Sequence, residues 1–290
     1  MYAVMGITGQ VGGATGRTLL AQGEQLRAIV RDPGKAAAWQ QQGAELAVAD
    51  FNDAAALANA FRGTDGVFVM LASNSAPSPD FAEARAGIQA LQQALTAARP
   101  SNVVALSSIG SKQTSGLGVI TTTHLLEEAL KPLGLPVAFL RAGSFMQNYK
   151  WDLQAARYTG EIESFYAPAD RPVPMVSTDD IGAIAARILT QAWTGIRTIE
   201  VAGPREFSPA DAAAAFSKAL NQQVLLKVLP RDAWEGALIA LGMPSERTFA
   251  RTDMVDSFNS GWIHFGVPGT ESIRGTIDLD TAIAQIVSGA

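Results

Sequence analysis

The sequence predicts an α/β fold built on a doubly wound parallel sheet, and three observations support this prediction. Short apolar segments alternate with helical segments through the first half of the chain. The strand-like segments are rich in β-branched residues and do not alternate strictly between polar and apolar positions, as expected for strands buried on both faces. A group of glycines follows the first strand directly, where a parallel strand must turn sharply into a helix.

The predicted elements of the first half follow one another in a regular order. Strands are expected at residues 2–5, 26–30, 44–49, 66–71, 103–107 and 137–140. Helices are expected at residues 11–22, 35–42, 53–61, 81–98 and 122–130. Because each strand is followed by a helix, the strands should lie parallel in one sheet.

The pattern becomes less regular after about residue 145. Further elements are expected as a helix at residues 181–191 and strands at residues 198–201 and 224–229. Ser208 is predicted to cap another helix, with Pro209 in its first position and Asp211 completing a capping box. The segment after Pro230 is expected to be mostly helix and loop.

Composition restricts the class of protein. The chain has 290 residues, a formal net charge of −5, two histidines and no cysteine. The acidic balance argues against direct binding of nucleic acid, which needs a basic surface. Without cysteine and with so few histidines, neither a thiol nucleophile nor a metal site is expected. No secretory signal or membrane-spanning stretch is visible, so the expected location is the cytoplasm; the sequence leaves the oligomeric state open.

A glycine turn joins the first strand to the first helix. Glycines at its three positions let the chain turn sharply, approach a diphosphate closely and direct helix N–H groups at it. The turn therefore predicts a Rossmann-type dinucleotide site, and the alternative is a structural turn in a cofactor-free domain. The residues expected to contact the cofactor here are Gly6, Thr8, Gly9, Gln10, Val11 and Gly12.

The end of the second strand bears on the choice of cofactor. Arg31 stands first after the strand, and Lys35 follows one turn later. An acid at this place binds the ribose hydroxyls of NAD, whereas an arginine accommodates the 2′-phosphate of NADP. We therefore expect NADP(H) to be preferred. NAD(H) is the alternative, because Asp32 could turn inward and the basic pair could simply be solvated.

Later strand ends extend the predicted cofactor site, since ligands bind beyond the carboxyl ends of such strands. Asp50 and Phe51 should border the adenine, although Asp50 could equally be an ordinary acid at a helix N-terminus. Leu71, Ala72 and Ser73 should face the pyrophosphate and the nicotinamide ribose.

Several segments together carry a family resemblance. They are residues 6–12, 30–33 with Lys35, 140–148, 176–182, and 201–204 with Ser208 and Asp211. In their order and spacing the sequence resembles the NmrA-like family of atypical short-chain dehydrogenase/reductases, in its quinone reductase-like branch. The resemblance implies a Rossmann domain over residues 1–150 that also takes in 176–202. It implies a smaller, partly interleaved C-terminal α+β domain over residues 151–175 and 203–290, with a substrate cleft between the two.

The resemblance leaves two functions open. The family includes NADPH-dependent quinone reductases, which implies an oxidoreductase that reduces a small planar acceptor such as a quinone. It also includes proteins that bind NADP(H) without turnover, which implies a redox sensor that binds a protein partner. A sugar epimerase or dehydratase is a weaker alternative, because its chemistry depends even more on the catalytic tyrosine and lysine of short-chain dehydrogenases.

The catalytic tyrosine and lysine of short-chain dehydrogenases are absent from the helix predicted at residues 122–130. Relatives with quinone reductase-like sequences often carry Lys-His with a glutamate four residues after the histidine. His124 and Glu128 fit that spacing, but Thr123 stands at the lysine position. The threonine at the lysine position favours the sensor hypothesis. A reductase remains tenable, because the cofactor carries the redox chemistry and a quinone does not strictly need a protein acid.

The candidate catalytic residues are Ser107 and His124. Ser107 lies at the end of the fifth strand, where it could contact the nicotinamide or bind a substrate carbonyl, and His124 could donate a proton. The alternatives are a serine that caps nearby backbone and a histidine bonded to a carbonyl or to Glu128. Thr123 could hydrogen-bond the cofactor ribose.

The segment after the last Rossmann strand is predicted to face both cofactor and substrate. The backbone of Ala142, Gly143 and Ser144 is expected beside the nicotinamide carboxamide, and Phe145 is also expected to contact the cofactor. A flat wall for a planar acceptor is predicted from Phe145, Asn148 and Trp151. Packing between the domains is the alternative role for this segment.

Overall fold

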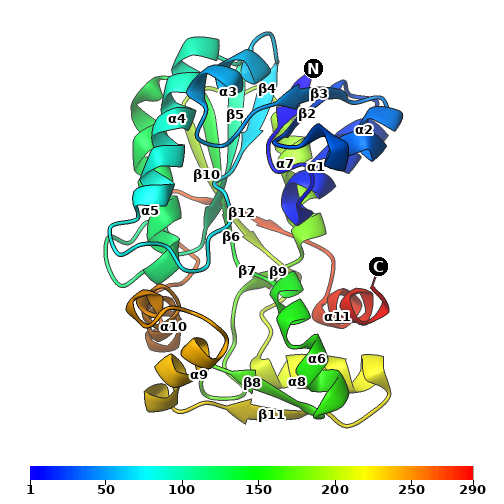
Figure 1. Ribbon diagram of the computed structural model, residues 1–290, viewed down its shortest axis with the longest axis vertical. Helices are drawn as coiled ribbons and strands as arrows, with labels where there is room; N and C mark the ends of the chain where they lie inside the picture. The colour runs from blue at the N-terminus through cyan, green and yellow to red at the C-terminus, as the bar shows by residue number, and fades with distance from the viewer. Residues whose placement is uncertain (290) are drawn as a thin grey trace.

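The computed structural model describes residues 1–289, with a large sheet between two helical layers and a smaller lobe below it (Figure 1). The large sheet has eight strands, all parallel, in the order β12-β10-β6-β5-β4-β1-β2-β3. Its strands are β1 (Tyr2–Val4), β2 (Leu26–Val30), β3 (Glu45–Val48), β4 (Gly66–Val69), β5 (Asn102–Ser108), β6 (Val137–Ala142), β10 (Ile196–Ala202) and β12 (Glu271–Arg274). The predicted doubly wound parallel sheet is confirmed.

The two helical layers bury opposite faces of this sheet. One layer holds α1 (Gln10–Ala21), α2 (Ala37–Gln41) and α7 (Thr178–Leu189). The other holds α3 (Ala54–Phe61), α4 (Ala82–Ala98) and α5 (Thr121–Leu130). Neighbouring residues along a strand enter different cores: Phe139 packs under α4 and α5, while Leu140 packs under α7. Both faces are apolar, which explains why the strands read as continuous hydrophobic runs.

Helices α1 and α7 approach each other very closely. A Cβ atom on Gly182 would lie 2.4 Å from Cβ of Ala14, so only glycine permits this contact. Arg17 on α1 also donates to Asp179 at the start of α7 over 3.0 Å. The close packing fixes the helix whose N-terminus forms the glycine turn.

The smaller lobe is connected to the sheet by the parallel pair β7 (Ser144–Phe145) and β9 (Met175–Val176). A second parallel pair, β8 (Glu161–Ser164) and β11 (Leu225–Val228), lies at the bottom of the lobe in Figure 1. The lobe's helices are the 3-10 helix η4 (Met146–Trp151), α6 (Leu153–Tyr158), α8 (Pro209–Leu220), α9 (Trp234–Ala240), α10 (Phe249–Ser260) and α11 (Leu279–Ser288). These elements surround their own apolar core.

The predicted start of α8 is confirmed. Ser208 Oγ accepts from the Asp211 N–H over 3.1 Å, and Asp211 Oδ2 accepts from the Ser208 N–H over 2.7 Å, which completes the capping box. Pro209 occupies the first position of the helix. No helix among residues 1–289 is both long enough and apolar enough to cross a membrane.

The segment after residue 230 is mostly helix and loop, as expected, and the short strand β12 adds an edge strand to the large sheet beside β10. Two buried carboxylates fasten this returning segment. Glu200 on β10 accepts from the N–H groups of Gly266 and Val267 over 2.8 and 3.1 Å. Asp180 on α7 accepts from the Ile277 N–H over 2.9 Å. The tail therefore crosses back from the lobe to the sheet.

Candidate cofactor and acceptor site

The glycine turn lies at the carboxyl end of β1 and leads directly into α1. Gly6 has φ +65°, a left-handed conformation that favours glycine, and its carbonyl accepts from the Gly9 N–H over 2.8 Å. A Cβ atom on Gly12 would lie 2.3 Å from the Gly6 oxygen, and one on Gly6 would lie 2.5 Å from Sδ of Met70. The backbone therefore passes through a space that side chains would fill.

The N-terminus of α1 offers an anion site without competing groups. Gly9 caps the helix without a side-chain hydrogen bond, and the first turn contains no acid. Within residues 1–289, no hydrogen bond occupies the N–H groups of Gln10, Val11 and Gly12. Thr8 and Gln10 are exposed beside them. Free N–H groups and the positive end of the helix dipole favour an anion, so this cradle fits a diphosphate.

The basic pair after β2 is available to a ligand. Arg31 and Lys35 are exposed, and neither side chain forms an ion pair with residues 1–289. Asp32 is committed to its own turn, because its Oδ1 accepts from the Gly34 N–H over 2.9 Å. One oxygen of the acid next to Arg31 is therefore engaged by its own turn, whereas the arginine and lysine have no ion-pair partner among residues 1–289.

The next strand ends supply less distinctive groups. Asp50 Oδ1 accepts from the Asn52 N–H over 2.9 Å, so this carboxylate closes its own turn. Phe51 is half-buried against the core under α3 and α4. Beyond β4, Leu71 is half-buried, whereas Ala72 and Ser73 are exposed. This segment can reach a ligand mainly through its backbone.

A buried polar network lies behind the ends of β5 and β6. Ser107 Oγ donates to Glu127 Oε1 over 2.6 Å. Arg141 binds both oxygens of the same carboxylate, from Nε over 2.9 Å and from Nη2 over 2.6 Å. Ser111 Oγ links Ser107 to Thr123 Oγ1 over distances of 3.1 and 2.7 Å. Glu127 is fully buried, and its bidentate arginine compensates the desolvated charge.

Sequence reasoning missed Glu127 and Arg141, although a signal for each was present. Arg141 is a lone arginine in an otherwise apolar strand, and Glu127 stands four residues after Thr123. Glu128, which was paired with His124 by spacing, is exposed instead. It binds Lys131 over 2.5 Å, and the hydrogen bond from this lysine lowers the pKa of Glu128.

His124 is half-buried near the start of α5. Its Nδ1 lies 2.9 Å from the Ser111 carbonyl oxygen, which can only accept, so Nδ1 carries the proton. In the neutral ring Nε2 is then an acceptor. His124 could act as a proton donor only after Nε2 had taken up a proton.

The segment after β6 is tied to the crossing strand β9. The Ser144 N–H donates to the Pro174 oxygen over 2.9 Å, and a Cβ atom on Gly143 would lie 2.6 Å from that oxygen. Ala142 is buried at the end of β6. Glycine at position 143 therefore allows the two backbones to cross where the sheet meets the lobe.

The three residues predicted to form an acceptor wall differ in exposure, and their role stays a prediction. Phe145 is half-buried against the core on the α1 and α7 side of the sheet. Asn148 is exposed, and Trp151 is 78% exposed, with Lys150 Nζ 5.1 Å from its ring centre. The aromatic neighbour of Ser144 is Tyr166, whose hydroxyl lies 3.4 Å from Ser144 Oγ.

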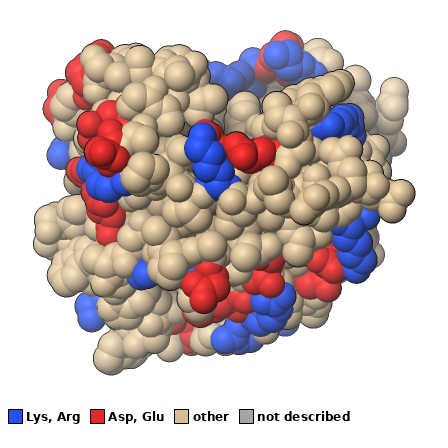
Figure 2. All heavy atoms as spheres, turned by 90° about the horizontal axis from the view of Figure 1, so that it is seen from below, with Lys and Arg blue, Asp and Glu red and all other residues tan. Residues whose placement is uncertain are grey.

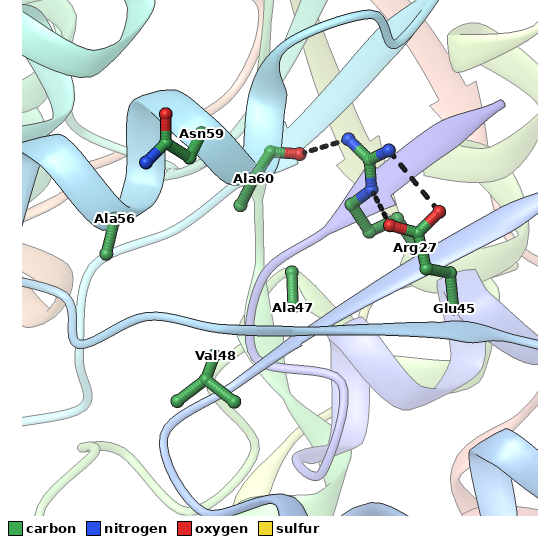
Figure 3. Close-up of a pocket in the computed structure, with 7 residues that line it drawn as sticks. All are labelled: Arg27, Glu45, Ala47, Val48, Ala56, Asn59 and Ala60. Carbon is green, nitrogen blue, oxygen red and sulfur yellow. Dashed lines mark hydrogen bonds and ion pairs between the residues drawn. The ribbon is translucent and has the colours of Figure 1, made fainter.

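A depression of about 310 Å³ lies elsewhere, on the outer side of β2, β3 and α3 (Figure 3). Its polar groups are already paired: Arg27 Nε donates to Glu45 Oε1 over 2.8 Å, and Arg27 Nη1 donates to the Ala60 oxygen over 2.9 Å. This surface offers a ligand no free charged group. The glycine turn is therefore the stronger candidate.

The fold and the turn together define a Rossmann-type α/β protein whose bare helix N-terminus, at the carboxyl edge of the sheet, fits a phosphate. Within that class the chain belongs to the NmrA-like family, whose model matches residues 2–261.

Two relatives of this chain carry the names of reductases. It is 29% identical over 258 residues to an NAD(P)H azoreductase of Xenophilus azovorans, which covers 88% of this chain and 86% of the relative. It is also 29% identical over 250 residues to quinone oxidoreductase 2 of Escherichia coli, covering 84% and 83% of the two chains.

Two solved structures share the complete fold. The NADPH-dependent quinone oxidoreductase of E. coli, determined with NADPH, has a TM-score of 0.79 and 26% identity, with coverage of 100% and 99%. The triphenylmethane reductase of Citrobacter sp., determined with NADP(H), has a TM-score of 0.82 at 19% identity, with coverage of 99% and 100%. The second likeness concerns the fold alone.

Proposed function

We propose that this protein is an NADPH-dependent oxidoreductase that reduces a small planar acceptor such as a quinone. The observation that carries the proposal is the bare N-terminus of α1 together with Arg31. Three free N–H groups suit a diphosphate, and the unpaired arginine suits a 2′-phosphate. The NADPH-bound E. coli relative supports the choice of cofactor.

The residues of this chain would bind and orient the reactants. The glycine turn and the basic pair would hold the cofactor, which supplies a hydride when bound. A quinone that accepts this hydride and one proton becomes a hydroquinone. His124 does not hold a ready proton on Nε2 in its neutral form, so we assign the proton to water. This assignment needs no tyrosine and lysine pair.

The test combines binding with turnover. Purified protein is titrated with NADPH and NADH by fluorescence, and oxidation of NADPH is then followed against a panel of quinones. We expect tighter binding of NADPH than of NADH, and reduction of at least one quinone. Binding of neither nucleotide would overturn the cofactor site. Tight binding without oxidation by any quinone would overturn the catalytic proposal.

A redox sensor is the second candidate, and the polar network supports it. Ser107 and Thr123, which lie near the usual place of the catalytic groups, are occupied by Glu127, Ser111 and neighbouring backbone. For a sensor, the same titration would give different affinities for NADPH and NADP⁺ without turnover.

A further inference from the structure

One arginine of the smaller lobe binds across to the large sheet. On the lower face of this lobe, acidic and basic residues lie side by side (Figure 2), and pairs such as Lys227 with Glu163 at 2.7 Å stay within the lobe. Arg247, just before α10, differs from them. Its Nη1 donates to the Ala76 oxygen over 2.8 Å, in the β4–α4 loop (residues 72–81). The side chain therefore connects the lobe to a loop of the large sheet.

Two further contacts strengthen this connection. Phe81, at the end of the β4–α4 loop, packs edge to face against Phe249 on α10, with ring centres 5.9 Å apart. Arg247 Nη1 also lies 3.6 Å from Oε1 of Glu83, in the first turn of α4. The other oxygen of Glu83 accepts from Ser78 Oγ over 2.6 Å, so the same carboxylate braces the loop. In Figure 1 the loop runs down from β4 toward α10 before it enters α4.

The loop begins at the crevice where a dinucleotide would bind. The strand order reverses between β1 and β4, because β2 and β3 extend from one side of β1, whereas β5 and β6 follow β4 on the other. Dinucleotides bind at such a reversal, beyond the carboxyl ends of the strands. The two segments lie close together, since a Cβ atom on Gly6 would lie 2.5 Å from Sδ of Met70, just after β4. The β4–α4 loop therefore starts beside the glycine turn and ends at the lobe.

The neighbouring loop after β5 is attached to α10 in a different way. There the backbones themselves meet, because a Cβ atom on Gly118 would lie 2.3 Å from the Ala250 oxygen. The β4–α4 loop is held to the lobe through the side chains of Arg247 and Phe81, and its residues 72–75 are exposed. This loop can therefore separate from the lobe while the loop after β5 stays in place.

We propose that Arg247 is a latch that holds the β4–α4 loop against the smaller lobe and sets the rate at which NADPH enters and leaves. A dinucleotide on the glycine turn lies in the crevice that this loop flanks, so the loop parts from the lobe during exchange. Because Arg247 binds the loop and not the nucleotide, it is a positioning residue, and the latch slows entry and release alike. The proposal rests on the proposed NADPH-dependent function and adds control of cofactor exchange.

The experiment measures the association and dissociation rate constants of NADPH by stopped-flow fluorescence. Arg247→Met removes the hydrogen-bond donor and the charge. Arg157→Met is the matched control, because Arg157 Nη2 also donates to a backbone oxygen, that of Val287 over 3.1 Å, but within the lobe. We expect both rate constants to rise by about tenfold in Arg247→Met, with the Kd unchanged. Arg157→Met should match the wild type, and Arg247→Lys, which keeps a donor, should restore part of the slow exchange.

A cross-link tests the opposite change. The chain contains no cysteine, so a pair introduced as Ala76→Cys and Arg247→Cys can be joined selectively by a short bismaleimide. The unjoined pair should exchange NADPH faster than the wild type, as Arg247→Met does, and the joined pair should exchange it more slowly. A purely structural role of Arg247 would not produce changes in both directions.

Each outcome has a distinct meaning. If both rate constants in Arg247→Met equal those of the wild type, the latch is refuted while NADPH binding stands. If only dissociation becomes faster, Arg247 contacts the nucleotide itself, which also refutes the latch. If the wild type binds no NADPH, the proposed function fails, and the latch fails with it.

Thermal denaturation of each variant identifies a folding defect. If Arg247→Met is damaged, Glu83→Gln replaces it, because glutamine removes the ion pair with Arg247 and keeps an acceptor for Ser78. Both rate constants should then rise by about twofold, since the lost ion pair is partly exposed. Unchanged rate constants in Glu83→Gln would also refute the proposal.

Discussion

Replacing Asp152 by asparagine should make the folded protein more stable at neutral pH. The carboxylate is desolvated and has no hydrogen-bond donor among residues 1–289, so its charge opposes folding. Asparagine keeps the shape and removes the charge. The charged and polar groups that face Asp152 are Arg251 from α10, Glu163 from β8 and Tyr149 from η4.

The pH dependence follows from the raised pKa. The pKa of Asp152 rises from 3.8 in the free side chain to about 6 in the folded chain, so the folded state binds the proton more tightly. The penalty is absent where both states are protonated, below the lower value. It grows as pH rises between the two values and is complete above about 6. A shift of this size corresponds to about 3 kcal/mol.

Urea denaturation of the wild type and Asp152→Asn at about pH 4 and about pH 7.5 measures this effect. The gain in unfolding free energy of the variant should be larger at the higher pH by up to about 3 kcal/mol. Taking the difference between the two proteins cancels the titration of all other groups. An equal gain at both pH values, or a variant less stable at the higher pH, would refute the reasoning about a desolvated, unpartnered carboxylate.

Three further substitutions test other parts of the site. Glu127→Gln should lower the unfolding free energy by about 3–5 kcal/mol in urea, because Arg141 would stay buried without its counter-charge. A loss below 1 kcal/mol would contradict this. Arg31→Glu should raise the Kd of NADPH by about tenfold to a hundredfold with little effect on NADH, whereas equal losses would exclude a phosphate contact. Gly12→Ala should weaken both nucleotides alike in the same titration, because its Cβ would lie 2.3 Å from the Gly6 oxygen; unchanged affinities would refute the cradle.

Most of the sheet could be predicted because its signals are local. A strand buried on both faces must be apolar along its length, and each helix after it carries its own periodicity. The capping box at Ser208 was also readable, since both partners lie within four residues. β12 was not predicted from the sequence, because it is an edge strand with mostly exposed side chains. Glu200 and Asp180, far away in the sequence, hold the segment around it in place. The residues of the strand itself carry no sequence pattern that indicates these distant contacts.

In the candidate site, too, local features could be predicted and contacts between distant residues could not. The glycine turn is a continuous segment whose geometry depends on its own glycines, so the sequence predicts it well. The contact of Glu127 with Ser107 and Arg141 joins three separate elements, and neighbouring Glu128 fitted the spacing equally well. Trp151 lies at the end of the 3-10 helix η4, and its side chain is 78% exposed. Its predicted place in an acceptor wall stays a prediction.

The acids Glu127 and Asp152 show how the surroundings of a carboxylate decide whether its charge stabilises the fold. Glu127 is satisfied by an arginine and a serine inside the protein, so its charge supports the fold and needs no ligand. Asp152 has no such partners among residues 1–289, and the fold tolerates its charge at a cost. Removing the first charge should damage the protein whether or not an acceptor is present. Removing the second should improve stability at neutral pH, where the carboxylate is charged.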